Sequence, residues 1–120
     1  LIANPIVEKA ICEELKKPTG ELTQADLENV VWLDLSDTKI TDAGLKEVAK
    51  LKQLTKLYLA GTKITNVGLK ELAKLQQLEA LYLGYALITD AGLKEVAKLQ
   101  QLTYLGLSPT DILKASAAEL

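Results

Sequence analysis

The stretch that decides the fold is Leu57–Ala80, which reads LYLAGTKITNVGLKELAKLQQLEA and has near-copies on both sides. Leu33–Lys56 reads LDLSDTKITDAGLKEVAKLKQLTK, and Leu81–Tyr104 reads LYLGYALITDAGLKEVAKLQQLTY. A fourth, shorter copy begins at Leu105 with LGLSPTDILKASAAEL. Repetition at a fixed period of about 20 to 50 residues is typical of a solenoid, in which each unit packs on its neighbours. The repeat therefore predicts the fold and directs the search for function to the side chains that successive units present in turn.

Each copy is predicted to hold one short strand and one helix. In the middle copy Leu57 and Leu59 alternate with outward-facing residues, which is the period-two pattern of a strand with one buried face. Thr65 precedes apolar residues at helical spacing, and its hydroxyl is expected to accept a hydrogen bond from the N–H three residues on. The helix is expected to cover about residues 66–75.

Neither element can bury its apolar side alone, so the copies are expected to stack into a parallel sheet covered by a row of helices. Strands lie about 4.8 Å apart and helices about 8 to 10 Å apart, which places the sheet on the concave side and the helices on the convex side. Gly68 and its counterparts open each helix, and we expect the missing side chain to let neighbouring helix starts pack closely. Thr62 and its counterparts Thr38 and Thr110 are expected to form a line that bonds neighbouring turns and that Ala86 interrupts.

The frame L-x-x-L-x-L-x-x-T-x-I-T-x-x-G-L, complete between Leu54 and Leu69, resembles a leucine-rich repeat of a short class, with Thr where Asn or Cys stands in the familiar ladder. The resemblance covers roughly residues 30–120. It implies an α/β fold class, namely a right-handed leucine-rich-repeat solenoid with a parallel concave sheet and helices on the convex side. The front of the chain, from Asn4 to Val30, resembles the helical N-terminal cap of internalin-like bacterial proteins.

The residues of the front segment support the same interpretation. Pro5 is a natural first residue of a helix, and Val7 and Ile11 lie on its apolar face. Thr23 and Asp26 predict the start of a second short helix that ends near residue 30. We therefore expect a helical N-terminal cap over residues 1–31 and about 3.5 leucine-rich units over residues 32–120, within a single structural domain.

Composition excludes several classes of function. The 120-residue chain has a net charge of −2 and a pI near 5.2, so it lacks the basic footprint of a nucleic-acid-binding protein. All 14 basic residues are lysine, and the absence of histidine removes the commonest general base. The sequence shows no signal peptide, no apolar run of about 18 residues that could span a membrane, and no cofactor or metal motif. Cys12 is expected to be a buried, inert thiol. The resemblance implies an extracellular or cell-surface location.

Every aromatic residue lies in one small set of positions. Four of them, Trp32, Tyr58, Tyr82 and Tyr104, are predicted to project from the outward side of a strand, and Tyr85 follows a strand. Tyrosine and tryptophan are enriched at interface hot spots, so these positions predict a binding surface. The alternative is that cross-strand aromatic pairs only stabilise a half-exposed sheet.

Other residues complete the predicted site. Asp34 and Lys56 are expected to set the polarity of the aromatic face. Tyr85 and Leu87 are expected to form its rim, the alternative being an unconstrained loop. We expect the helix side to be a solvated face rather than an anion site, because it alternates lysine with Glu47, Glu71 and Glu95.

These residues favour a non-enzymatic module that binds a protein or a peptide on the concave aromatic face, with a glycan as the weaker expectation. A designed or excised repeat scaffold without a natural ligand is one alternative, because the copies are nearly identical. The recognition part of a larger receptor or effector is another. An enzyme is not expected, since no nucleophile, base and orienting group come together in the sequence.

The end of the array has no predicted cap. Its apolar residues are Leu105, Leu107, Ile112 and Leu120. Covering them between two chains would bury apolar surface, so self-association through this end is a further expectation.

Overall fold

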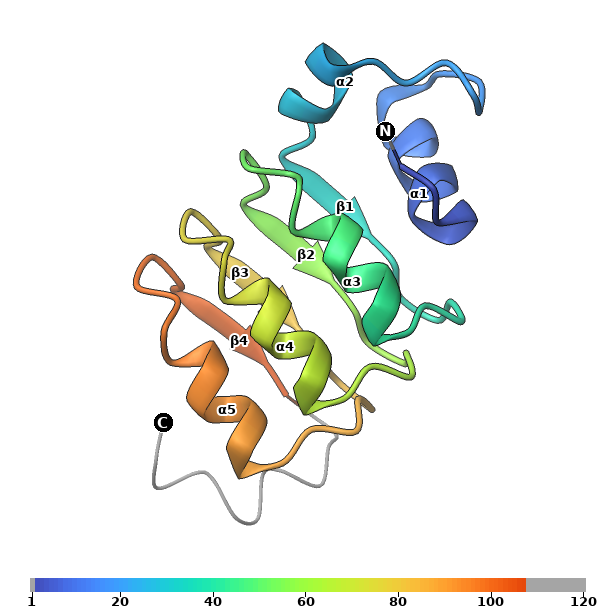
Figure 1. Ribbon diagram of the computed structural model, residues 1–120. Helices are drawn as coiled ribbons and strands as arrows, with labels where there is room; N and C mark the ends of the chain where they lie inside the picture. The colour runs from blue at the N-terminus through green and yellow to red at the C-terminus, as the bar shows by residue number, and fades with distance from the viewer. Residues whose placement is uncertain (1, 108–120) are drawn as a thin grey trace.

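The computed structural model of the chain describes residues 2–107, in which short strands form one parallel sheet. The strands follow chain order and are β1 (Trp32–Asp34), β2 (Lys56–Tyr58), β3 (Ala80–Tyr82) and β4 (Tyr104–Gly106). The helices α3 (Asp42–Val48), α4 (Asn66–Leu72) and α5 (Asp90–Val96) lie side by side along one face of the sheet (Figure 1). This arrangement confirms the predicted solenoid. The predictions for Thr110, Ile112 and Leu120 lie outside the described residues.

The register of the sheet follows the period of the sequence. Leu57 of β2 pairs with Leu33 on one side and with Leu81 on the other, so each strand aligns with the residue 24 positions away. Leu57 and Leu59 are fully buried, and the side chains of the main hydrophobic cluster among the described residues are all aliphatic. The predicted division between a leucine face and an outward face is therefore confirmed. No helix among the described residues is long and apolar enough to cross a membrane.

Two helices precede the repeats. As predicted, α1 (Pro5–Leu15) begins at Pro5, and the Asn4 Oδ1 atom caps it by accepting the N–H groups of Ile6 and Val7. The second helix, α2 (Gln24–Glu28), starts with a capping box between Thr23 and Asp26. The buried side chains of this front segment, which join the core of the repeats, are Val7, Ile11, Leu27 and Val30.

The helices of the repeats are shorter than predicted. The helix expected over residues 66–75 ends at Leu72, with Ala73 as its C-cap. The next turn is tighter, because the Leu75 N–H donates to the Leu72 carbonyl at 2.9 Å. This turn brings Leu75 into the core, where it is fully buried.

The capping threonines bond across the repeats rather than as predicted. The Thr65 hydroxyl accepts the N–H of Val67 at 3.3 Å, not the N–H three residues on, and the equivalent hydroxyls in the other repeats make no cap bond. Instead, the Asp42 carboxylate accepts the Thr65 N–H at 2.7 Å and the Thr65 hydroxyl at 2.5 Å. Asn66 bonds Thr89 in the next repeat: its Oδ1 atom accepts the Thr89 N–H at 3.0 Å, and its Nδ2 atom donates to the Thr89 hydroxyl at 2.6 Å. We call these two contacts the inter-repeat clamps.

A second threonine prediction was also wrong. The hydroxyls of Thr38 and Thr62 each donate to a carbonyl of their own repeat, those of Leu35 and Leu59, at 2.7 Å. These bonds close the turn after the strand within one unit. They do not form a ladder between neighbouring turns.

The helix-opening glycines make room for the clamps, which supports the predicted close packing of helix starts. A Cβ atom on Gly68 would lie 2.5 Å from Asp42 Oδ1 and 2.6 Å from Leu45 Cδ1. The Asp42 oxygen is held by Thr65, and Leu45 is fully buried, so neither atom can move freely.

Glu47 holds the start of the chain against α3. Its carboxylate accepts the backbone N–H groups of Asn4 at 2.6 Å and Ala3 at 3.1 Å. Burial by itself would raise the pKa of this carboxyl, but the two N–H donors and the nearby Lys50 outweigh burial and hold the pKa below the usual 4.5.

Replacing Glu47 by Gln removes the charge from both of these hydrogen bonds. We expect Glu47→Gln to lose about 1 to 2 kcal/mol of unfolding free energy at neutral pH, measured by urea denaturation. Glu95→Gln is the matched control, because the Glu95 side chain is 17% exposed against 16% for Glu47 but pairs with the exposed Lys98. The control should lose no more than about 0.5 kcal/mol. Equal losses would contradict the role given to Glu47.

The contribution of Glu47 should also depend on pH. Its folded-state pKa lies below the usual 4.5, so the stabilisation is complete above about that pH and is lost as the pH falls through the folded-state value. We expect the stability gap between the wild type and Glu47→Gln to be constant near neutral pH and to shrink in more acidic buffer. A gap that widens on acidification would contradict this sign.

Gly68→Ala tests the space beside the clamp. In an ordinary helix this change stabilises by about 0.5 to 1 kcal/mol. Here we expect a loss of about 1 to 2 kcal/mol in urea denaturation, because the new methyl group meets Asp42 and Leu45. Combining the change with Asp42→Ala should reduce the penalty. A gain in stability from Gly68→Ala alone would show that the contact is not tight.

Candidate functional site

Four aromatic rings form a continuous row on the sheet. The ring centroids of Trp32 and Tyr58 are 5.4 Å apart, those of Tyr58 and Tyr82 4.2 Å, and those of Tyr82 and Tyr104 4.9 Å. The Tyr58 and Tyr82 rings are parallel to within 4°, whereas the outer pairs are tilted by 59° and 37°. We call these four residues the aromatic belt. The structure thus brings together the four predicted anchors.

Strand register explains the belt. Tyr58 and Tyr82 are direct partners in neighbouring parallel strands, and their side chains point away from the buried leucines. Trp32 and Tyr104 lie two residues earlier in their own strands, so the belt steps sideways at each end. Gly106 is in register with Tyr82, and a Cβ atom there would lie 3.2 Å from Tyr82 Cδ1. This glycine leaves room for the rings, a role that was not predicted from the sequence.

The belt is partly open to solvent, since Tyr104 is exposed and Trp32, Tyr58 and Tyr82 are half-buried. The faces of Tyr58 and Tyr82 stack on each other, and each of these rings also contacts a tilted outer ring, Trp32 or Tyr104. The pKa of the Tyr82 phenol is raised above its usual value of 10, first by a hydrogen bond with Tyr58, then by partial desolvation and the nearby Tyr58 and Tyr104 phenols. The phenol therefore stays protonated near neutral pH and can donate as well as accept hydrogen bonds.

The two predicted charges lie beside the belt. Asp34 is in register with Tyr58, and its Oδ1 atom accepts the N–H of Ser36 at 2.9 Å, which fixes the carboxylate over its own turn. Lys56 is exposed and in register with Trp32 and Ala80. Both charges belong to β1 and β2, whereas the outward positions of β3 and β4 carry no charge. The face therefore has a polar end and an apolar end.

The two residues predicted to form the rim are strongly exposed. Tyr85 is 68% exposed and Leu87 is 63% exposed, and Tyr85 makes no ring contact with the belt in the part of the chain that the structure describes. Leu87 bridges to Thr65, two residues before Val67, which is 65% exposed. Val67 was missed from sequence, although a comparison of copies would have found it because Ala43 and Ala91 occupy its place. We call Val67, Tyr85 and Leu87 the rim group.

Tyr85 has an unfavourable backbone conformation. Its φ of 64° lies in the left-handed region, as do those of the equivalent residues Asp37, at 57°, and Gly61, at 71°. Glycine adopts this conformation without cost, and aspartate is among the residues that tolerate it. A bulky aromatic residue is disfavoured there, so the turn holds an exposed ring at an energetic cost.

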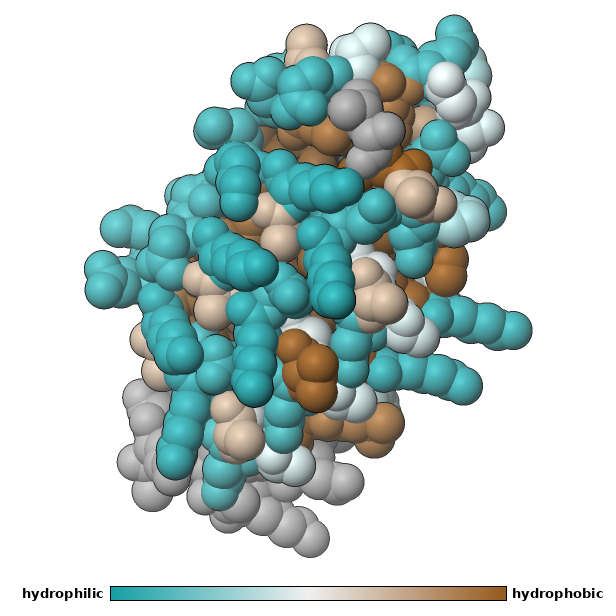
Figure 2. Space-filling view, viewed as in Figure 1, coloured by the Kyte–Doolittle hydropathy of each residue, from teal (hydrophilic) through white to brown (hydrophobic). Residues whose placement is uncertain are grey.

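The opposite face of the molecule has a different character. Figure 2 shows a mostly hydrophilic surface over α3, α4 and α5. Lys74 pairs with Glu71 at 2.7 Å and Lys98 with Glu95 at 3.0 Å, so lysine and glutamate side chains pair along this face. Cys12 is buried, and burial is the main cause that raises the pKa of its thiol. Among the described residues, no group of three or more His, Cys, Asp or Glu side chains could hold a metal ion.

Comparisons with known proteins agree with this geometry. Two sequence families, both described as leucine rich repeat, match residues 52–112 and residues 29–49. No curated protein sequence matches the chain.

Solved structures show the same fold. An internalin (inlF) from Listeria monocytogenes matches 92% of this chain with a TM-score of 0.60 and 23% identity, and the chain covers 39% of that structure. The CBM51-2 and INT domains of ZmpB from Clostridium perfringens match 75% of this chain with a TM-score of 0.58 and 26% identity, and the chain covers 19% of that structure. The in-phase leucines, the parallel sheet under its row of helices and a family match to just over half of the sequence lead to one conclusion: this chain belongs to the leucine-rich-repeat family.

Proposed function

We propose that the chain is a non-enzymatic interaction module that binds a protein or a peptide through the aromatic belt. The observation that carries this proposal is the unbroken contact of four half-exposed or exposed aromatic rings on the sheet face opposite the helices. Leucine-rich repeats generally serve recognition, which agrees with this role.

The belt is suited to binding because its rings are already ordered. A ring that already packs between two neighbouring rings loses little freedom when a partner covers it, so less entropy opposes association. Tyrosine and tryptophan also combine a large apolar area with a polar group, which is why they dominate interface hot spots. A role limited to sheet stability would not require the rings to be solvent-accessible.

Ring stacking favours a protein or peptide partner over a glycan. A sugar would need a free ring face on which to lie, and at the centre of the belt Tyr58 and Tyr82 turn one face each toward the other and also contact an outer ring. The exposed edges and hydroxyls instead suit side chains and backbone carbonyls. The apolar end over β3 and β4 would take aliphatic or aromatic side chains, and Asp34 and Lys56 would orient the polar end of the partner.

The module is proposed to be the recognition part of a larger receptor or effector. The chain covers 39% of the internalin that shares its fold, so further units or domains would complete the parent protein. On the same likeness we propose a cell-surface or extracellular location. A repeat scaffold without a ligand is the second candidate, and the near-identity of the three full copies favours it.

Tyr82→Ala should remove the centre of the belt. The probe is a peptide selected on the immobilised wild-type chain from a displayed random library, with its Kd measured by calorimetry. We expect Tyr82→Ala to weaken binding by about 2 kcal/mol or more, since hot-spot side chains contribute on this scale. Lys70→Ala, on α4 at the opposite face, should leave the Kd unchanged.

Circular dichroism and urea denaturation must show that each variant remains folded. If Tyr58→Ala and Tyr82→Ala both bind the selected peptide as the wild type does, the belt is not the binding site. If no selected peptide binds the wild type more tightly than Tyr82→Ala, the result would instead favour the second candidate, a repeat scaffold without a ligand.

Tyr85→Gly separates binding from stability in the rim group. Replacing the ring relieves the left-handed strain, so we expect a gain of about 0.5 to 1 kcal/mol in unfolding free energy. If the rim contacts the partner, affinity should fall by about 1 kcal/mol or more. Asp37→Gly is the control, because Asp37 holds the same left-handed turn position after β1 that Tyr85 holds after β3. This change should leave affinity unchanged. Unaltered binding in Tyr85→Gly would restrict the site to the belt.

A further inference from the structure

The largest described hollow on the helical side lies between the front segment and the first repeats. Its volume is about 640 Å³, and its lining residues are Gln24, Leu27, Lys46, Ala49, Lys50, Lys52 and Lys74. Small-molecule sites usually measure about 300 to 1,000 Å³, so this space could hold a compact ligand. All of its ionisable lining residues are lysines, in a chain whose net charge is −2.

Most of these lysines have an ordinary explanation. Lys46 belongs to α3, Lys50 and Lys74 follow the ends of α3 and α4, and cations are favourable at helix C-termini. Lys74 also pairs with Glu71 at 2.7 Å, and Lys50 lies 3.6 Å from Glu47. The same lysines recur in each repeat. Repetition of the unit therefore explains the presence of Lys46, Lys50 and Lys74 without a ligand.

Lys52 has no such explanation. It lies beyond the end of α3, and the other repeats have Gln76 and Gln100 in its place. Its ammonium group makes no hydrogen bond or ion pair within residues 2–107. Lys52 therefore adds a positive charge only in the repeat where α2 lines one side of the hollow.

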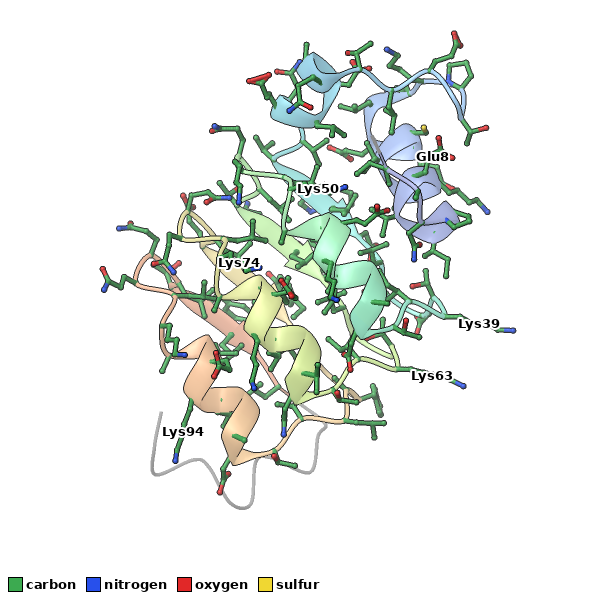
Figure 3. All side chains as sticks on the ribbon, in the orientation of Figure 1. Glu8, Lys39, Lys50, Lys63, Lys74 and Lys94 are labelled. Carbon is green, nitrogen blue, oxygen red and sulfur yellow. The ribbon has the colours of Figure 1, made fainter. Side chains whose placement is uncertain are left out.

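The acidic groups near the hollow are already occupied. Both carboxylate oxygens of Glu47 accept backbone N–H groups of the chain start. The pKa of Glu71 is lowered first by the hydrogen bond from Lys74 and also by the charges of Lys74 and Lys46. The lining of the hollow holds four ammonium groups and no carboxylate, and the ion pairs with Glu47 and Glu71 engage Lys50 and Lys74. Figure 3 shows Lys50 and Lys74 over this side of the molecule, away from Lys39 and Lys63.

We propose that this hollow binds a small anion that carries several adjacent phosphate groups. Lysine ammoniums act as point charges without the planar fork of arginine, so they suit a dense, multiply charged anion more than a planar carboxylate. Lys46, Lys50, Lys52 and Lys74 would surround the charges, and the Gln24 amide would donate a further hydrogen bond. Leu27 and Ala49 would line the apolar floor.

The test is a titration of the folded chain with inorganic tripolyphosphate at constant ionic strength. Binding is monitored through the NMR chemical shifts of the backbone amides of residues 49 and 52. Lys52→Gln installs the residue of the other repeats and should weaken binding about fivefold, because one of four cations is lost. Lys94→Gln removes the same charge from α5 and should change affinity less than twofold. Sulfate, a single dianion, should bind much more weakly than tripolyphosphate.

Two results would overturn the proposal. Equal weakening by Lys52→Gln and Lys94→Gln would show that the anion follows the overall charge rather than the hollow. Absence of saturable shifts at Ala49 and Lys52 would show that no site exists there. The outcome is independent of the aromatic belt, which lies on the other face.

Discussion

The structure depends on a fixed advance of 24 residues from one unit to the next. This advance pairs Leu57 with Leu33 and Leu81, so the buried leucines of neighbouring strands stack on their equivalents. Because side chains alternate along a strand, a slip of one residue would turn Leu57 outward and Tyr58 inward. The clamps from Asp42 and Asn66 reinforce the same advance on the helix side. Core, clamps and belt are therefore three results of one register.

The features that could be predicted from the sequence are those that recur in each repeat or depend on neighbouring residues. The strand faces follow from alternating leucines, and the helix starts at Pro5 and after Thr23 follow from local capping chemistry. The hydroxyl of Thr65 was assigned wrongly because its partner, Asp42, is distant in sequence and adjacent only in the stacked array. The predicted length of α4 was too great, because Ala73 and Lys74 continue the helical pattern of the sequence. In the structure the helix ends at Leu72, and the tighter turn that follows buries Leu75.

The candidate site was predictable in position but not in geometry. Alternation shows that Tyr58 and Tyr82 point outward, yet their parallel stacking depends on strand spacing and on the space that Gly106 leaves. The left-handed turn at Tyr85 was not predicted, because no residue type in that copy signals it. The lysine hollow requires α2 and Lys52 to line the same space, and these two segments share no sequence pattern.

The belt has a spectroscopic consequence. Trp32 is the sole indole of the chain and lies 5.4 Å from the first of three successive phenol rings. Tyrosine emission overlaps tryptophan absorption, so light absorbed along the row passes by resonance energy transfer to this single emitter. Ultraviolet excitation of the tyrosines therefore yields a signal from one end of the sheet, which makes the unlabelled protein an optical sensor of anything that settles on that face.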